Sequence, residues 1–335
     1  MAEDQTPRRV TLKDVAREAD VSVASASYAI NGTGSLGSAV RAHILGVAAR
    51  LGYRQNMSAR AMRTGKTGAI GLVVPDFTNP FFTSLAQSVM RSARLAGYCV
   101  FVTDTEESED LEREAFKHMI NRGVDGVVWF PIRDINTVEP QTKIVPTLLL
   151  DRSIEGLESI LADYDSGGKL AARHLLALGH TKIGIVAGPL DIVSQRQRIE
   201  GAVATLGESV SFQVSNGFSM DLEPLVQRTV LESGVTAIFA GTDLIAMGVI
   251  RCLQNKGLRV PEDVSVVGFG DMPWAPLSNP SLTTVEMPIE DMAATAVETL
   301  IGRIENRPPL RPRGVFSTRL IVRGSTAQLR QQRVS

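Results

Sequence analysis

Basic side chains are concentrated at the start of this sequence. Residues 1–66 contain ten Lys or Arg and five Asp or Glu, a net charge of +5, whereas the rest of the chain carries −6. Lys and Arg bind phosphates, so a basic segment on an acidic body indicates contact with a polyanion such as nucleic acid. Chance clustering of charge on a solvated surface is the alternative, and the charge count alone does not separate the two.

The other residue types that could carry chemistry form no recognisable catalytic or metal-binding pattern. The sequence has no P-loop, no G-x-G-x-x-G after the first expected strand and no nucleophile elbow. The histidines and cysteines are scattered, at His43, His118, His174, His180, Cys99 and Cys252. We therefore expect no enzyme activity, no cofactor and no metal site. Without a signal peptide or the roughly 18 apolar residues of a membrane span, the expected location is the cytoplasm.

Three short helices are expected to position the basic segment. Thr11 precedes the first, with Asp14 three residues later, which approximates a capping box. Ser22 can cap a second helix, VASASYAI, that ends at an Asn-Gly pair, and a third runs from about residue 38 to 51. Two helices joined by a turn of about three or four residues fit a helix-turn-helix, but any helical hairpin fits equally well.

From residue 69 onward the sequence alternates strands with helices. The first run, AIGLVVP, is apolar throughout and bounded by proline, as is typical of a buried parallel strand. The alternation runs in two series, and the second begins near residue 165. This predicts a small all-α helix-turn-helix domain followed by an α/β body of two doubly wound parallel-sheet lobes. Such sheets bind ligands at the carboxyl ends of their strands, so two facing lobes would share a cleft.

Particular strings give a more specific indication. They are TLKDVAREADVSVASASYAING, VRAHILGVAARLGYRQNMSARAMRTGKTGAIGLVVPDFTNPFF, LLLDRS, HLLALGHTKIGIVAGP, VPEDVSVVGF and NPSLTTV. In this order, over about residues 10–325, they resemble the lac/gal repressor family of bacterial transcriptional regulators. The resemblance implies a DNA-binding domain at 1–55, a hinge helix or linker at 56–67, and a periplasmic-binding-protein-like effector-binding and dimerisation domain at 68–335. The expected lobes are N, about 68–163 plus 289–317, and C, about 164–288 plus 318–330.

The resemblance assigns DNA contacts to the second helix and to the helix starts. The residues assigned in this domain are Thr11, Ser22, Val23, Ala24, Ser27, Tyr28 and Asn31. Ser22, Ser27 and Asn31 match positions that hold backbone phosphates. Val23, Ala24 and Tyr28 match base-reading positions. Because the first two can only pack, for example on a thymine methyl, direct readout is expected to be modest.

Two departures from the family pattern affect the DNA-binding domain expected at 1–55. Asp20 replaces the usual turn glycine, at a position expected to need a left-handed backbone. Gly37 and the pair Ala39-Val40 replace the Ser and Glu-Thr that usually open the third helix, which weakens its cap.

The Arg-rich segment Asn56–Thr64 matches the hinge helix of the family. In relatives a leucine enters the minor groove and kinks the duplex, and here Met62 stands at that position. Arg60 and Arg63 would contact phosphates or the minor groove, and Asn56 is assigned to the same interface. An ordinary flexible linker is the alternative interpretation.

The resemblance also places an effector site after the strand ends of the body. The assigned residues are Asp76, Asn79, Phe81, Asp151, Arg198, Phe218, Thr242, Asp243 and Asp271. A carboxylate such as Asp151 accepts bonds from vicinal hydroxyls, Arg198 donates a planar fork, and Phe81 or Phe218 could cover the apolar face of a sugar. The alternative is that Asp151 only caps a helix and that Arg198 pairs with it without ligand.

Two cleft positions differ from many relatives. Gly270 stands where an Asp binds ligand hydroxyls, and Met287 stands where Gln is common. Losing an acid beside Arg198 makes the cleft more positive, which favours a sugar acid or phosphate over a neutral sugar unless Asp271 turns into the cleft. The expected partners are palindromic double-stranded DNA, a sugar or sugar acid, and a second copy of the chain as a homodimer.

The sequence therefore predicts a DNA-binding transcriptional regulator, specifically a repressor controlled by a small polar metabolite. The alternatives are a plain solute-binding protein and an enzyme of doubly wound fold. The head and the missing signal peptide argue against the first, and the missing catalytic motifs argue against the second.

Overall fold

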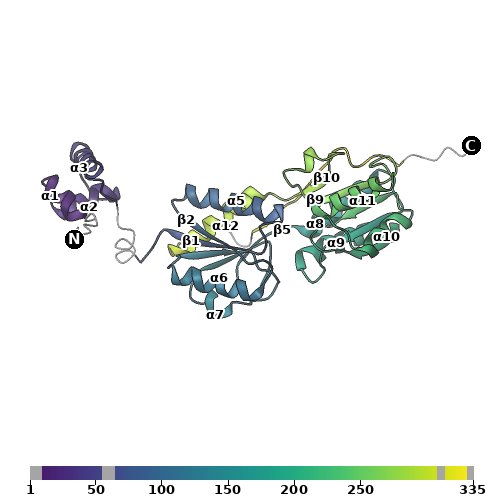
Figure 1. Ribbon diagram of the computed structural model, residues 1–335, viewed down its shortest axis with the longest axis horizontal. Helices are drawn as coiled ribbons and strands as arrows, with labels where there is room; N and C mark the ends of the chain where they lie inside the picture. Colours follow the sequence, from purple (N-terminus) through teal and green to yellow (C-terminus); the bar gives the residue numbers. More distant parts are fainter. Residues whose placement is uncertain (1–9, 55–64, 308–313, 330–335) are drawn as a thin grey trace, which may run out of the picture. The chain divides into compact units, whose positions relative to one another are not determined.

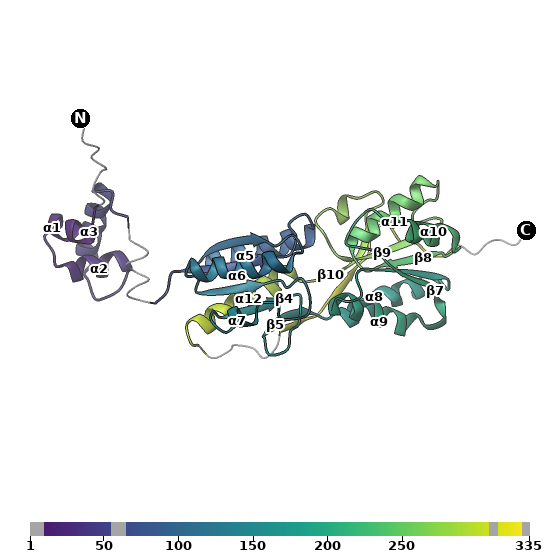
Figure 2. The same cartoon turned by 60° about the horizontal axis from the view of Figure 1, so that its bottom comes forward.

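The computed structural model describes residues 10–54, 65–307 and 314–329 of the chain. It divides into two compact units, Met1–Thr67 and Gly68–Ser335, which are described separately below (Figures 1 and 2). Within the described residues, no helix has the length and apolar character needed to cross a membrane.

The first unit, called the head, contains three helices: α1 (Leu12–Glu18), α2 (Val23–Asn31) and α3 (Ser38–Arg50). The capping box expected at α1 is confirmed, because Asp14 N donates to the Thr11 hydroxyl at 3.4 Å and Thr11 N donates to the Asp14 carboxylate at 2.9 Å. The Ser22 hydroxyl caps α2 by accepting from Ser25 N at 3.0 Å. Gly37 at the start of α3 supplies no side-chain bond, as expected of the weaker cap.

Small side chains let the helices of the head pack closely. Ala16 of α1 and Ala26 of α2 are buried together with Val15, and Ile44 and Val47 of α3 complete the core. Methyl-sized contacts allow α1 and α2 to approach at the tight turn between them. The turn residue Asp20 has φ of 51°, so the left-handed backbone expected there is confirmed.

We expect Asp20→Gly to stabilise the head by about 1 kcal/mol, because glycine adopts a positive φ without a clash involving Cβ. Hydrogen exchange of the α1 and α2 amides in the full chain would slow severalfold. The control is Asp20→Ala, which removes the same charge but keeps Cβ, and which should speed exchange instead. Equal exchange in both variants would show that the turn stores no backbone strain.

The second unit, called the body, has two lobes, each with a central sheet (Figure 1). The N-lobe sheet has the strand order β11-β5-β4-β3-β1-β2. Its strands are β1 (Ala69–Val74), β2 (Cys99–Asp104), β3 (Gly126–Trp129), β4 (Thr147–Leu150), β5 (Ser159–Ala162) and β11 (Gly314–Phe316). Helices α5 (Pro80–Leu95) and α12 (Ile289–Ile304) pack together on one face, and α6 (Glu109–Asn121) and the short α7 (Glu139–Thr142) cover the other (Figure 1). With both faces covered, the central strands are buried.

The C-lobe sheet has the strand order β12-β10-β9-β8-β6-β7. Its strands are β6 (Ile183–Ala187), β7 (Val210–Ser215), β8 (Ala237–Ala240), β9 (Ser265–Gly270), β10 (Thr283–Glu286) and β12 (Arg319–Ile321). Helices α8 (Tyr164–Ala177) and α9 (Val193–Leu206) lie on one face, and α10 (Pro224–Glu232) and α11 (Asp243–Asn255) lie on the other. Short 3-10 turns occupy Gly207–Ser209 and Ala275–Leu277.

The described strands are parallel except β12, which pairs antiparallel with β10. The two parallel-sheet lobes expected from the sequence are confirmed, with one antiparallel strand at the edge of the C-lobe sheet. Strand β10 leads out of the C lobe toward α12, and β12 leads back into the C lobe from β11, so the two strands run in opposite directions. The chain also passes between the lobes after β5 and after β10.

Helices α8 and α9 pack with their backbones in contact. A Cβ added at Gly168 would lie 1.9 Å from the carbonyl oxygen of Arg198, and one added at Gly201 would lie 2.2 Å from that of Asp165. Both positions need glycine, because any side chain would prevent this approach. Since Arg198 belongs to α9, the contact fixes the position of Arg198 relative to the rest of the lobe.

Candidate functional site

One face of α2 presents apolar side chains to solvent. Val23 is 45% exposed and Tyr28 is 48% exposed, and Ala24 between them is also exposed. The opposite face carries the buried Ala26 and Ala29. An exposed Val, Ala and Tyr side by side on a small basic unit form a surface suited to contact with another molecule.

Polar residues around this face are already oriented by local bonds. Asn31 Nδ2 donates to the carbonyl oxygen of Ser27 at 2.7 Å and lies 3.0 Å from its hydroxyl. The Tyr28 ring lies against Gly34, where an added Cβ would be 2.8 Å from the ring. Arg41 donates from Nη2 to the carbonyl oxygens of Thr33 and Gly34 at 3.3 Å and so supports the loop under Tyr28.

The structure thus brings six of the seven head residues predicted from the sequence onto α2 or its cap, and places Thr11 at the start of α1. The predicted hinge contacts Asn56, Arg60, Met62 and Arg63 lie outside the described residues.

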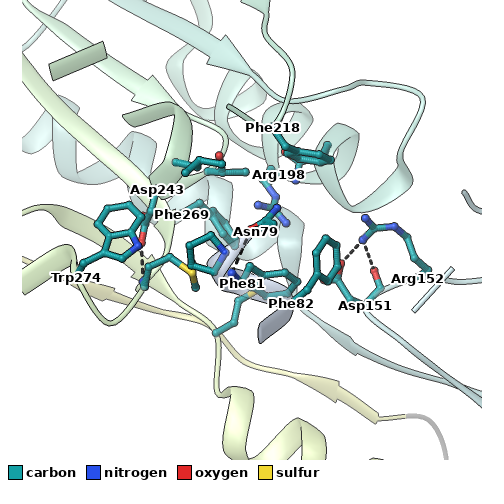
Figure 3. Close-up of a pocket in the computed structure, with 17 residues that line it drawn as sticks. Asn79, Phe81, Phe82, Asp151, Arg152, Arg198, Phe218, Asp243, Phe269 and Trp274 are labelled. Carbon is teal, nitrogen blue, oxygen red and sulfur yellow. Dashed lines mark hydrogen bonds and ion pairs between the residues drawn. The ribbon is translucent and has the colours of Figure 1, made fainter. Parts of the chain in front are cut away.

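A pocket lies between the two lobes, at the carboxyl ends of their strands (Figure 3). Seven of the nine effector residues predicted from the sequence line it: Asn79, Phe81, Asp151, Arg198, Phe218, Thr242 and Asp243. Its free volume is about 40 Å³, which holds about three water molecules. A molecule the size of a sugar therefore enters only if side chains or lobes move apart.

Asp151 and Arg152 connect the lobes at one end of the pocket. Both are buried, and the Arg152 guanidinium donates to the Asp151 carboxylate (Figure 3). Across the cleft, Tyr164 OH donates to Asp151 at 2.5 Å and Arg152 Nη1 donates to the Ser194 hydroxyl at 3.2 Å. Asp151, at φ of 66°, is thus fully engaged by protein groups. Burial, followed by the Asp151 charge, raises the pKa of Tyr164 well above its usual value, so Tyr164 remains a hydrogen-bond donor.

Arg198 is a buried cation with aromatic neighbours. Nε donates to the carbonyl oxygen of Ser194 at 3.1 Å, and Nη1 donates to that of Gly241 at 2.7 Å. The guanidinium carbon lies 4.0 Å from the centre of the Phe269 ring and 5.1 Å from that of Tyr164. Among the described residues, no carboxylate makes an ion pair with Arg198, and burial lowers its pKa to about 10. The site therefore holds a positive charge that protein contacts leave without an anion.

The carboxylate of Asp243 is hydrogen-bonded to groups of the C lobe. Its carboxylate accepts from Met272 N at 2.7 Å and from the Thr284 hydroxyl at 2.5 Å. Burial raises its pKa to about 6, against the lowering effect of these two bonds. Its neighbour Thr242 caps α11 by accepting from Ile245 N at 3.2 Å. Both residues fix the strand ends that form one wall of the pocket.

The other two predicted effector residues lie outside this pocket. Asp76 accepts from the backbone N and the hydroxyl of Thr78, both at 2.7 Å, and thereby closes a local turn. Asp271, at φ of 52°, is paired with Arg323 at 2.7 Å. Because Asp271 lies beside Arg323 and does not line the pocket, it does not replace the acid that is missing at Gly270.

Several pocket residues were not identified from the sequence: Phe82, Arg152, Gln195, Phe269, Met272 and Trp274. For Arg152 a signal was available, since it directly follows Asp151 at a strand end. Gln195 shares a helical turn with Arg198, but nothing in the sequence indicated that its side chain is buried. Among the described residues, no group of three or more His, Cys, Asp or Glu could hold a metal ion.

A second connection between the lobes lies at the start of α9. Ile192, at the N-cap of α9, supplies no side-chain bond, and instead Asp134 of the N lobe accepts from Val193 N at 2.7 Å. Beside it, Arg133 and Asp191 pair at 3.5 Å. The helix that carries Gln195 and Arg198 is therefore capped by a carboxylate of the opposite lobe.

Comparison with known proteins extends these observations to the whole chain. Residues 11–56 match the family described as bacterial regulatory proteins, lacI family, and residues 172–326 match the periplasmic binding protein-like domain. The chain is 33% identical over 325 residues to the ribose operon repressor of Halalkalibacterium halodurans, which covers 94% of this chain and 97% of that protein. It is 31% identical to the HTH-type transcriptional repressor PurR of Aliivibrio salmonicida, over 89% of this chain and 93% of that one.

A solved structure has a similar fold. The crystal structure of the lac repressor dimer, bound to operator and the anti-inducer ONPF, matches with a TM-score of 0.83 and 25% identity over 96% of this chain and 100% of that chain.

Proposed function

The chain belongs to the lacI family of bacterial regulatory proteins, and we propose that α2 reads a palindromic operator while the interlobe pocket binds the controlling effector. The protein is a DNA-binding transcriptional regulator, like the relatives whose names describe operon repressors. The enzyme and solute-binding alternatives are therefore set aside. We propose that it acts as a homodimer, with the hinge contacts Asn56, Arg60, Met62 and Arg63 on the same DNA.

The observation that carries this proposal is a pocket lined from both lobes. Phe81 and Asp151 come from the N lobe, and Arg198 and Phe218 come from the C lobe. A ligand that touches both sides favours one relative orientation of the lobes by the difference in its affinity for the two orientations. A change in that orientation would alter the spacing of the hinges in a dimer and thereby the operator affinity.

The charges in the pocket favour an anionic effector. Arg152 and Arg198 face one carboxylate, Asp151, that is engaged by Arg152 and Tyr164. Asp243 is committed to Met272 and Thr284, and position 270 is glycine. Aromatic rings of Phe81, Phe218 and Trp274 complete the lining. We propose a sugar acid or a similar small polyhydroxy anion, with an aromatic ring against its apolar face.

The function is tested by selecting duplexes from random DNA with the full chain, and then measuring operator affinity with and without a panel of sugars, sugar acids and sugar phosphates. An effector should change operator affinity by about 5- to 150-fold, the usual range of such coupling. Binding of a panel compound with no selected DNA sequence would instead indicate a solute-binding protein. Chemical conversion of the compound would indicate an enzyme.

Tyr28→Ala is expected to weaken binding to the selected operator roughly tenfold, because it removes one side chain from the base-reading face. Binding to scrambled duplex at the same salt concentration should change little, since phosphate contacts remain. Fluorescence anisotropy with both duplexes measures the difference. Leu45→Ala, on an exposed part of α3, is the matched control. If Leu45→Ala weakens operator binding and Tyr28→Ala does not, then α2 is not the reading helix.

A further inference from the structure

Gln195 is a buried polar residue whose amide oxygen has no partner. It is the third residue of α9, 4% exposed, and lines the interlobe pocket. In the described part of the chain, its Oε1 makes no hydrogen bond. Buried amide groups are normally hydrogen-bonded, because leaving one unpaired costs the free energy of removing it from water. The unpaired amide is therefore a position where a ligand can supply the missing bond.

Two glycines make the space that this side chain occupies. A Cβ at Gly188 would lie 2.6 Å from Gln195 Oε1, and one at Gly241 would lie 3.2 Å from it. Gly188 also adjoins Phe218, whose ring would be 3.2 Å from the same added Cβ. The amide is thus held against the backbone at the ends of β6 and β8, beside an aromatic ring of the pocket.

Arg198 converges on the same place. It lies three residues after Gln195, on the same side of α9, and its Nη1 donates to the carbonyl oxygen of Gly241. The amide of Gln195 and the guanidinium of Arg198 are therefore neighbours across Gly241. One is an unsatisfied polar group, and the other is a buried cation without an ion-pair partner among the described residues.

Together, these two groups indicate which chemical groups a ligand needs. An anionic group satisfies the Arg198 charge, and a hydroxyl satisfies Gln195 in either orientation of its amide, because a hydroxyl both donates and accepts. We propose that Gln195 determines effector specificity by binding a hydroxyl adjacent to the anionic group held by Arg198. The effector is then a small polyhydroxy anion, a sugar acid or a sugar phosphate. This inference rests on the proposed function, since it takes the pocket as the effector site.

Gln195→Leu tests the inference in two independent ways. Leucine has nearly the same volume but no polar atoms, so the effector-free protein should unfold at a higher temperature. For the compound that binds the wild-type protein most tightly, affinity should fall at least tenfold. The test compounds are D-gluconate, D-galacturonate, D-ribonate and D-ribose 5-phosphate. The control compounds are D-glucitol and D-ribose, which lack the charge, and hexanoate, which lacks the hydroxyls. Binding is measured by calorimetry with the full chain.

The expected result is that a hydroxylated anion binds and that D-glucitol, D-ribose and hexanoate do not. Comparing the affinities of the three sugar acids with that of D-ribose 5-phosphate shows whether the anionic group is a carboxylate or a phosphate. The proposal is overturned if neutral compounds bind best, if no hydroxylated anion binds, or if Gln195→Leu retains full affinity. Gln197→Leu, at an exposed position of α9, is the control and should change neither readout. A hydroxylated anion that binds through Gln195 but leaves operator affinity unchanged would contradict the regulatory function alone.

Discussion

Replacing Arg198 with alanine is expected to abolish the response of operator binding to effector, while effector-free operator affinity stays near that of the wild type. Arg198 lies in the body, and its bonds join Ser194 and Gly241 within the C lobe. Charge-assisted bonds to a buried anion are among the strongest in proteins, so effector affinity should fall by about 100-fold or more. Calorimetry measures the affinity, and anisotropy measures the operator response.

Two further variants separate the role of the charge from general damage. Arg198→Lys keeps the positive charge but loses the planar fork, so it should restore only part of the affinity. Arg196→Ala changes an exposed arginine of the same helix and should respond like wild type. A full effector response in Arg198→Ala would mean that the signal enters the body somewhere other than this pocket.

Gly168→Ala is expected to destabilise the body by about 3 kcal/mol, because the added methyl group would overlap the carbonyl oxygen of Arg198. The two helices must separate to admit it, and α9 would shift together with Arg198 and Gln195. Chemical unfolding of the full chain gives the stability, and calorimetry should show weaker effector binding as well.

The control for Gly168→Ala is Gly302→Ala. Gly302 lies within α12, where an added Cβ meets no atom within 4 Å. Alanine favours a helix over glycine by about 1 kcal/mol, so this variant should be slightly more stable than wild type. If both substitutions change the free energy of unfolding in the same direction, the close approach of α8 and α9 does not decide the result.

Local patterns in the sequence were sufficient for most of the fold. The capping box at Thr11 and the cap at Ser22 depend on residues within four positions of each other, so the sequence displays them directly. The apolar runs of the body likewise predict buried strands from their composition. The antiparallel edge strand β12 was not predictable in this way, because its direction depends on how the chain leads back into the C lobe from β11.

The site was harder to predict because its contacts are distant along the chain. Asp271 pairs with Arg323, and Asp76 bonds within its own turn, so two carboxylates expected in the pocket are used elsewhere. Gly270 has φ of 136°, which side chains rarely adopt, so this departure from the family pattern alters the backbone as well as the charge. Gln195 could be identified only from the structure, in which its amide oxygen is buried and has no hydrogen-bond partner.

The carboxylate of Asp134 that caps α9 from the opposite lobe has a consequence for the sensitivity of the regulator. Opening the cleft breaks this bond but exposes both groups to water, so the bond biases the lobes toward closure by a small amount. The apparent affinity for a ligand scales with the fraction of molecules already in the form that binds it, and a sugar-sized ligand enters this pocket only after side chains or lobes move apart. Residue 134 can therefore set the concentration threshold of the response for all effectors alike, while Gln195 and Arg198 select among them. Threshold and selectivity would then reside in different residues and could change independently during evolution.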